Sequence, residues 1–206
     1  MIPLQQYPEP PYFDDKVRQP GRKHLQAQRI KLNDIGVESS KFFPYWTNCK
    51  DDLEKFYNNY CAYTCFHMHS TEDSTIDHIK PKTCVEAYWA YEWNNYCLCC
   101  LVINRKKGNR YQSIIDPYKV TKNLFFLVLE TGYIYANTGH SDYALADSTI
   151  TNLDLNNQRW WKERQKAYID FKKDRISGAS LKRAEENLKN KNIFVWSEAK
   201  RQGKLV

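Results

Sequence analysis

The longest strongly apolar run of this sequence, Leu124 to Leu129, is far too short to cross a membrane. A membrane-spanning helix needs roughly 20 consecutive apolar residues, so we expect no such span. The chain has 206 residues, of which 42% are hydrophobic, and this is ample for a packed core. Its first residues have neither a basic start nor the apolar segment of an export signal. We therefore expect a soluble, folded protein that remains in the cytoplasm.

Glycine and cysteine usage narrows the class of protein further. The 7 glycines form neither a G-x-G-x-x-G turn nor a G-x-x-x-x-G-K-[ST] loop, so we do not expect an ATPase or a Rossmann enzyme in this chain alone. The 7 cysteines are odd in number, and two of them, Cys99 and Cys100, are adjacent. Reduced thiols or metal ligands are therefore favoured over a disulfide framework.

Positive charge is concentrated near the end of the chain. The formal net charge is +7, and residues 159–206 contain 14 Lys and Arg against 6 Asp and Glu. A basic segment of this kind suits a polyanion such as nucleic acid. Well-solvated helix faces have the same composition and are the alternative interpretation.

Turn residues and hydrophobic periodicity divide the chain into short elements. Five prolines between Pro3 and Gly21 predict an extended arm. The pattern further predicts a helix over 47–60 capped by Thr47, strands over 74–79 and 95–100, a helix over 101–107, a hairpin over 123–137, and helices from 149 onward with a break at Ser177-Gly178. We divide the chain into a proline-rich N-terminal segment (1–46), a central unit (47–118), and a C-terminal part with the hairpin and basic helices (119–206).

The stretch 61–110 contains the residues most suited to chemistry. Asp77 and His78 end a predicted strand ahead of a proline, and a strand end is a rigid place to present catalytic groups. A second strand begins near Asn95, and the helix after it carries Asn104. One carboxylate and one amide oxygen in this arrangement can bind a hard divalent cation, which leaves the imidazole free to act as a base. An ordinary ion pair is the alternative for Asp77 and His78, and a turn-forming residue is the alternative for Asn95.

The order of these residues resembles the HNH nuclease family, through the motifs D-H-I-x-P, W-x-N-Y and N-x-x-K-G. The resemblance covers roughly residues 61–109. It implies an α+β fold, in which a central ββα-metal (HNH) unit is embedded in a mostly helical body with an extra β-hairpin and basic C-terminal helices.

The resemblance also implies a role for each matching residue. His78 is expected to be the general base that activates water, and Asp77 and Asn104 are expected to hold Mg²⁺ or Mn²⁺. Asn95 is expected to brace the connecting loop and so to orient His78. Four basic residues are expected to contact backbone phosphate: Arg105, Lys106, Lys107 and Arg110. The residue types suit hydrolysis of a phosphodiester, because histidine can deprotonate water near neutral pH and a loosely held metal keeps positions open for the substrate.

Many members of this family carry a structural zinc held by two C-x-x-C pairs, and this sequence departs from that pattern. Cys61 and Cys65 are spaced C-x-x-x-C, and Cys100 is followed three residues later by Ile103. A tetrahedral site needs a fourth ligand. The candidates for it are His67, His69, Cys97 and Cys99. We expect no structural zinc, and instead buried cysteines that pack as small apolar groups.

Weaker motifs spread over residues 10–156 resemble one branch of the family, the HNH nuclease subunit of Septu-type and retron-linked anti-phage systems. They include Pro10-Pro11, Ala90-Tyr91-Glu92-Trp93, Asp116-Pro117-Tyr118, and Thr149-Ile150 with Leu153. This branch implies a bacterial defence complex with an ABC-type or OLD-like ATPase partner, and a retron reverse transcriptase with its RNA–DNA product as a further partner. The expected function is cleavage of nucleic acid, with DNA favoured. The alternatives are a ribonuclease that cuts structured RNA such as tRNA, and a non-catalytic nucleic-acid-binding or scaffold subunit.

Overall fold

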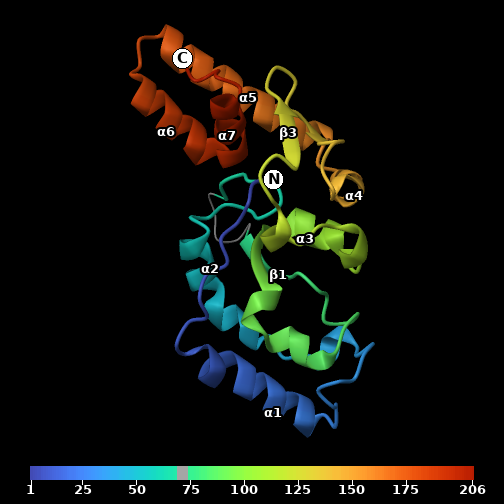
Figure 1. The fold of residues 1–206 in the computed structure, drawn as a ribbon. Helices are drawn as coiled ribbons and strands as arrows, with labels where there is room; N and C mark the ends of the chain where they lie inside the picture. Colours follow the sequence, from blue (N-terminus) through green and yellow to red (C-terminus); the bar gives the residue numbers. More distant parts are fainter. Residues whose placement is uncertain (69–73) are drawn as a thin grey trace.

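The computed structural model describes residues 1–68 and 74–206, and it confirms the predicted α+β class. Two small antiparallel sheets are combined with helices. The main elements are α1 (Gln19–Ala27), α2 (Lys50–Phe56), β1 (Ser74–His78), β2 (Tyr96–Cys100), α3 (Leu101–Lys107), β3 (Phe125–Val128), β4 (Tyr133–Ala136), α4 (Tyr143–Leu153), α5 (Gln158–Ile176), α6 (Leu181–Lys191) and α7 (Ile193–Arg201). In Figure 1, β1 and α3 lie at the centre, α1 lies at one end of the molecule, and α5 to α7 lie at the other.

The N-terminal segment is only partly extended, so the prediction for Pro3 to Gly21 was wrong in its second half. A π-helical segment, Asp14–Arg18, continues into α1. Pro20 is the second residue of α1 and lies within this continuous helical stretch, directly after the π-helical segment. Phe13 and Val17 are fully buried one helical turn apart. This burial outweighs the local preference of a proline-rich segment for extended backbone.

The helix predicted over residues 47–60 is shorter and differently started. A 3-10 segment, Tyr45–Cys49, precedes α2, and the Thr47 hydroxyl donates to the carbonyl of Pro44 rather than capping the helix. Asn58 and Asn59 both have positive φ, which ends α2 before residue 60. Leu53 and Tyr57 are buried, so this part of the chain packs on the core.

The two strands and the helix of the central unit follow the predicted boundaries closely. β1 and β2 pair antiparallel, with Asp77 opposite Cys97 and His78 opposite Tyr96. The next backbone bond, from Ile79 N to Asn95 O at 2.8 Å, extends the ladder past the strand ends. α3 follows β2 directly, so its first turn lies against the same ribbon.

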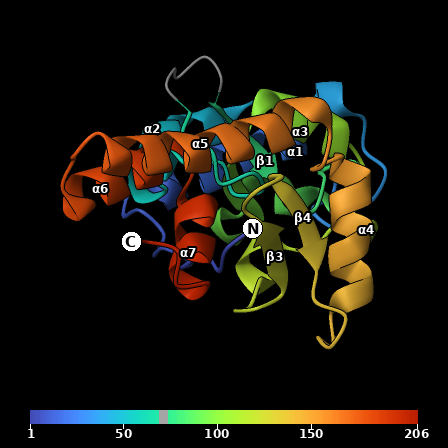
Figure 2. The same ribbon diagram turned by 90° about the horizontal axis from the view of Figure 1, so that it is seen from above.

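The hairpin of β3 and β4 is stabilised by polar side chains from outside the sheet. An isolated two-stranded hairpin is marginal in water, and its edges have unpaired backbone groups. Glu198 of α7 accepts from Leu127 N at 2.9 Å. Asn156 binds both backbone groups of Ile134, at 2.8 Å each. Figure 2 shows the hairpin between α4 and α7.

The C-terminal helices are joined to the central unit through Asn192, which is fully buried. Its side-chain oxygen caps α7 by accepting from Phe194 N and Val195 N at 3.0 Å each. Its amide nitrogen donates to Thr64 O at 3.3 Å. This cap divides the predicted C-terminal helical stretch into α6 and α7, and a single apolar core runs through both parts of the molecule. None of the described helices is long and apolar enough to span a bilayer.

Gly132 offers a test of how closely the hairpin packs on α5. Its φ is +76°, and a Cβ there would lie 2.1 Å from Trp161 O, whereas Gly178, with φ +89°, has open space around it. We expect Gly178→Ala to lower the free energy of unfolding by about 1 kcal/mol through backbone strain. Gly132→Ala should lower it by about 2 kcal/mol more, because the backbone of α5 must also move. Urea denaturation of the two variants measures the difference, and equal losses would contradict the close contact.

Candidate active site

A cavity of about 480 Å³ opens where β1 ends beside α3. It is lined by Asp77 and His78 from β1 and by Asn104 and Lys107 from α3. Trp46, from the 3-10 segment before α2, and Lys82, from the loop after β1, complete the charged and aromatic part of the wall. The structure therefore brings together the predicted base and both predicted metal ligands.

His78 is held in one orientation by the loop that precedes β2. Its Nε2 lies 3.0 Å from the carbonyl oxygen of Ala90, and the ring packs edge-on against Trp46 and Tyr96. A carbonyl oxygen can only accept, so Nε2 carries the proton and Nδ1 carries the lone pair. Burial, followed by the charge of Lys82, lowers the pKa of His78 to about 3. The imidazole is therefore neutral, and its Nδ1 makes no hydrogen bond with the described residues.

Asn95 fastens the loop that orients His78. Its side-chain oxygen accepts from Lys80 N at 2.8 Å, and its amide nitrogen donates to Lys80 O and to Trp89 O. The side chain is 2% exposed. Trp89 directly precedes Ala90, so one amide group links the end of β1 to the carbonyl that holds the imidazole. This geometry matches the predicted bracing role of Asn95.

The carboxylate of Asp77 is buried and already has hydrogen-bond partners. Lys107 Nζ donates to its Oδ1 at 2.9 Å, and the Tyr63 hydroxyl donates to its Oδ2 at 2.7 Å. The Cys97 thiol lies 3.7 Å from the same Oδ2. Burial raises the pKa of Asp77, and the charge of Lys107 offsets part of this rise.

Asp77 and Asn104 retain the donor atoms that a hard divalent cation prefers. A carboxylate has about four lone-pair sites. Three hydrogen-bond donors contact Asp77, so its oxygens can still bind a cation. The amide nitrogen of Asn104 donates to Ile76 O at 3.3 Å, and no described residue donates to its amide oxygen. Carboxylate and amide oxygens suit Mg²⁺ and Mn²⁺. The two residues fit such an ion, with Lys107 as a competing cation on Asp77.

The four residues predicted to contact phosphate lie in different surroundings. Lys107 is 2% exposed and binds Asp77 and His78 O, so it differs from the predicted surface contact. Lys106 pairs with Asp154 at 2.6 Å. Arg110 is exposed and donates to the carbonyl of Lys106, and Arg105 is exposed. The prediction was correct that the segment is basic, but it missed that two of its charges have carboxylate partners.

Three residues of the site were not identified from the sequence. Lys82 follows the D-H-I-K-P stretch directly, and its closeness to Asp77 and His78 was an available signal. Trp46 and Tyr63 lie upstream of the motif and reach it only through the tertiary fold, so no local spacing indicates them.

The cysteine cluster has a different membership from the predicted set. The sulfur atoms of Cys61, Cys99 and Cys100 lie within 4.8 Å of one another. Cys65 is outside the group, and its φ of +59° turns the backbone at that point. Among the residues described here, no fourth His, Cys, Asp or Glu joins the three thiols. His69 lies outside the described residues, and half-buried His67 packs edge-on against Tyr60.

The three thiols share one favoured site of ionisation. Burial raises the pKa of Cys61, but hydrogen bonds from the Cys100 and Cys99 thiols and from Thr64 outweigh it and bring the pKa well below its usual range. The hydrogen bond to Cys61 raises the pKa of Cys100 to about 12, and burial raises that of Cys99. Cys61 is therefore the thiol of the cluster that ionises most readily.

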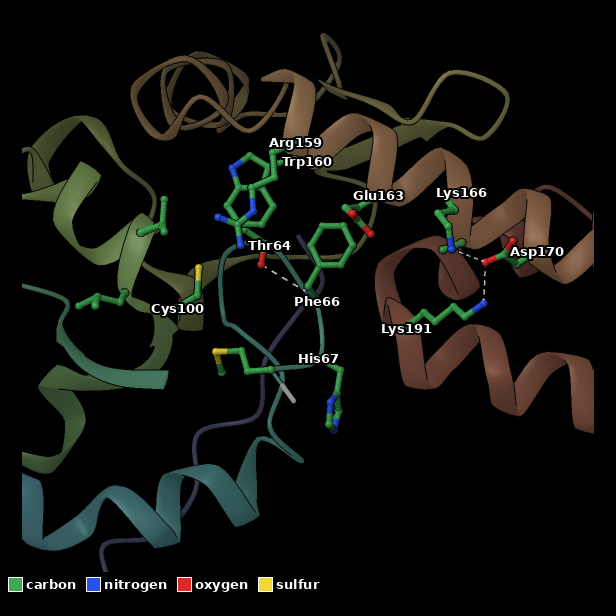
Figure 3. Close-up of a pocket in the computed structure, with 14 residues that line it drawn as sticks. Thr64, Phe66, His67, Cys100, Arg159, Trp160, Glu163, Lys166, Asp170 and Lys191 are labelled. Carbon is green, nitrogen blue, oxygen red and sulfur yellow. Dashed lines mark hydrogen bonds and ion pairs between the residues drawn. The ribbon is translucent and has the colours of Figure 1, made fainter. Parts of the chain in front are cut away.

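A second cavity, of about 370 Å³, lies between segment 64–68 and α5 (Figure 3). Arg159, Glu163, Lys166 and Asp170 follow one side of α5 along its rim. Asp170 accepts from Lys166 at 3.1 Å and from Lys191 at 2.7 Å. The charges on this rim alternate in sign, and the walls include Trp160, Met68 and Ala167. His67 and the carboxylates of Glu163 and Asp170 also line it, but Asp170 is already paired with Lys166 and Lys191.

Two comparisons with known proteins gave no match. No protein-family model matches the chain, and no curated protein matches it.

The neutral state of His78 makes the stability of the fold depend on pH. The pKa is about 3 in the folded chain and about 6.5 in an unfolded one. Below pH 6.5 the unfolded chain therefore binds a proton that the folded chain does not, and stability falls as the pH falls. Between pH 7 and pH 5 we expect His78 to account for a loss of about 2 kcal/mol. Urea denaturation in metal-free buffer, with His78→Gln for comparison, measures this loss. An equal loss in both proteins would show that the imidazole is not desolvated.

Proposed function

We propose that this chain is a metal-dependent endonuclease of the HNH type, which hydrolyses phosphodiester bonds of nucleic acid, with DNA as the favoured substrate. One observation carries the proposal. The Nε2 of His78 is bound to the Ala90 carbonyl, which leaves Nδ1 without a partner among the described residues, and His78, Asp77 and Asn104 line the same cavity.

In this proposal each residue has one chemical task. His78 Nδ1 accepts a proton from the attacking water, and Asn95 keeps the imidazole aligned through the loop. Asp77 and Asn104 hold Mg²⁺ or Mn²⁺, which, when bound, neutralises charge on the phosphate and on the leaving 3′ oxygen. Lys107 already offsets the charge of Asp77. A site with one partly neutralised carboxylate holds the cation loosely and leaves positions for the substrate.

The wider biological role in the proposal rests on the sequence. The motifs over residues 10–156 and the lack of a nucleotide-binding loop support an effector subunit of a bacterial defence complex with an ABC-type or OLD-like ATPase partner. The excess of Lys and Arg in residues 159–206 offers a second positive surface, for nucleic acid or for an acidic partner.

The central test is metal-dependent cleavage by the purified chain, alone and with any ATPase subunit that co-purifies with it. Plasmid DNA and end-labelled total RNA are incubated side by side with Mg²⁺ or Mn²⁺. We expect His78→Ala to lose cleavage by at least about 1,000-fold, with an unchanged circular dichroism spectrum. His140→Ala, which removes a histidine far from the cavity, should retain it. Unchanged cleavage in His78→Ala contradicts the proposal, and cleavage of RNA alone assigns the ribonuclease alternative.

Loss of Mn²⁺ binding in Asp77→Asn is also required, and wild-type protein that binds no Mn²⁺ supports a non-catalytic subunit.

Asn95 provides a second test, because it orients the base without contacting the substrate. Asn95→Asp keeps the acceptor for Lys80 N but places a carboxylate against the carbonyl oxygens of Lys80 and Trp89. We expect kcat to fall about 100-fold with little change in KM, as for a misaligned base. The ring resonances of His78 in an NMR spectrum should shift in the same variant. A wild-type kcat, or a loss confined to KM, would contradict the positioning role.

A further inference from the structure

Lys82 places a positive charge in the active-site cavity, and no carboxylate of the described residues pairs with it. Its side chain lines the cavity beside Asp77 and His78 and is half-buried. Within residues 1–68 and 74–206 it has neither a hydrogen bond nor an ion pair. Lys107 and Lys106, in contrast, are paired with Asp77 and Asp154. Lys82 is therefore the cation of this cavity that remains available to a ligand.

Aromatic rings hold this ammonium group near the base. The Nζ of Lys82 lies 4.6 Å from the centre of the Trp46 ring and 5.9 Å from that of Phe42. The Trp46 ring in turn packs edge-on against His78, with centres 4.7 Å apart. An ammonium over an indole face is stabilised electrostatically while its N–H donors stay free. Trp46 thus positions Lys82 and His78 on the same side of the cavity.

The charge balance of the cavity favours a monoanion. Asp77 is the single carboxylate among the described residues that line it, and Lys107 neutralises that carboxylate. Without a bound metal ion, Lys82 leaves the described residues of the cavity with a net charge of one positive unit. A partly desolvated cation without a counter-ion is costly for the fold, so its presence indicates a ligand that returns the missing charge. A phosphodiester group carries one negative charge.

We propose that Lys82 and Trp46 form an anion subsite that takes a non-bridging oxygen of the phosphodiester to be cleaved, with Lys82 Nζ as the donor. The inference rests on the proposed nuclease function and deepens it, because it names the group that binds the substrate phosphate. In this inference Lys82, and not Lys107, makes the phosphate contact that the sequence predicted for Lys107. An ammonium suits this task, since it binds phosphate as a compact point charge with freely rotating donors.

Cleavage kinetics of Lys82→Met test the subsite against a matched control. Lys16→Met also removes one lysine held over an aromatic ring, that of Tyr12, but on the N-terminal helical segment outside the cavity. We expect Lys82→Met to lower kcat/KM about 100-fold and to reduce the slope of log(kcat/KM) against log[salt] by about 0.9. Lys82→Arg should recover most of the loss, and Lys16→Met should match wild type. Equal kinetics for Lys82→Met and Lys16→Met would overturn the inference while the nuclease function stands.

A binding measurement separates the two proposals. Dimethyl phosphate, a minimal phosphodiester, is titrated into the full chain, and the indole N–H resonance of Trp46, assigned with Trp46→Phe, is followed by NMR. We expect dimethyl phosphate to shift this resonance saturably in the wild type and not in Lys82→Met. Sodium chloride at equal ionic strength should not shift it. The absence of such a shift, or its survival in Lys82→Met, would overturn the subsite even if the chain cleaves nucleic acid. A chain that cleaves nothing but shows the Lys82-dependent shift loses the nuclease proposal and keeps the subsite.

Thermal stability gives a readout that a structural role would not produce. Because Lys82 lacks a counter-ion, Lys82→Met should melt at the wild-type temperature or above it while kcat/KM falls. A variant that loses stability and activity together would assign Lys82 to the packing of Trp46 and would overturn the subsite.

Discussion

The side-chain amide of Asn95 is the interaction on which the geometry of the central cavity depends. It joins both backbone groups of Lys80, just after β1, to the carbonyl of Trp89 in the loop before β2. The adjacent Ala90 carbonyl then binds His78 Nε2 and the Tyr96 hydroxyl. The side chains of Asn95, His78 and Tyr96 are buried, so an unmade hydrogen bond there would be expensive. The position of the imidazole is therefore determined by loop backbone as well as by its own strand.

A second constraint is the arrangement of charge around β1. Asp77 and His78 are neighbours in the sequence, so their side chains leave opposite faces of the strand. Asp77 meets Tyr63 and Lys107, while His78 meets Trp46 and Tyr96. Because the strand ends here, both residues still border one cavity. Burial keeps the imidazole neutral, and the buried ammonium of Lys107 keeps the carboxylate compensated. Lys82 has no carboxylate partner among the described residues, so its positive charge makes the cavity attractive to an anion.

Local patterns predicted the elements that depend on local chemistry. The strand predicted over 74–79, the asparagines before β2 and the break at Ser177-Gly178 lie where the structure has strand, turn and helix end. The wrong predictions concern residues whose conformation or neighbours depend on burial or on partners distant in the sequence. Proline composition suggested an extended arm, but Phe13 and Val17 enter the core as helix. Spacing suggested Cys65 as a partner of Cys61 and Cys100, whereas the fold brings Cys99 to them.

The sequence by itself indicated two strands and a helix near Asp77, His78, Asn95 and Asn104, and the resemblance carried by the order of these residues implied one strand–strand–helix unit. It also determined the basic character of the segment after Asn104. Only the tertiary structure decided which of those charges remain available. Lys107 turns inward to Asp77, Lys106 meets Asp154 nearly fifty residues later, and Trp46 arrives from upstream to hold Lys82. The composition gives the number of charged residues. Their chemistry depends on burial and on partners distant in the chain, and only the packed fold specifies these.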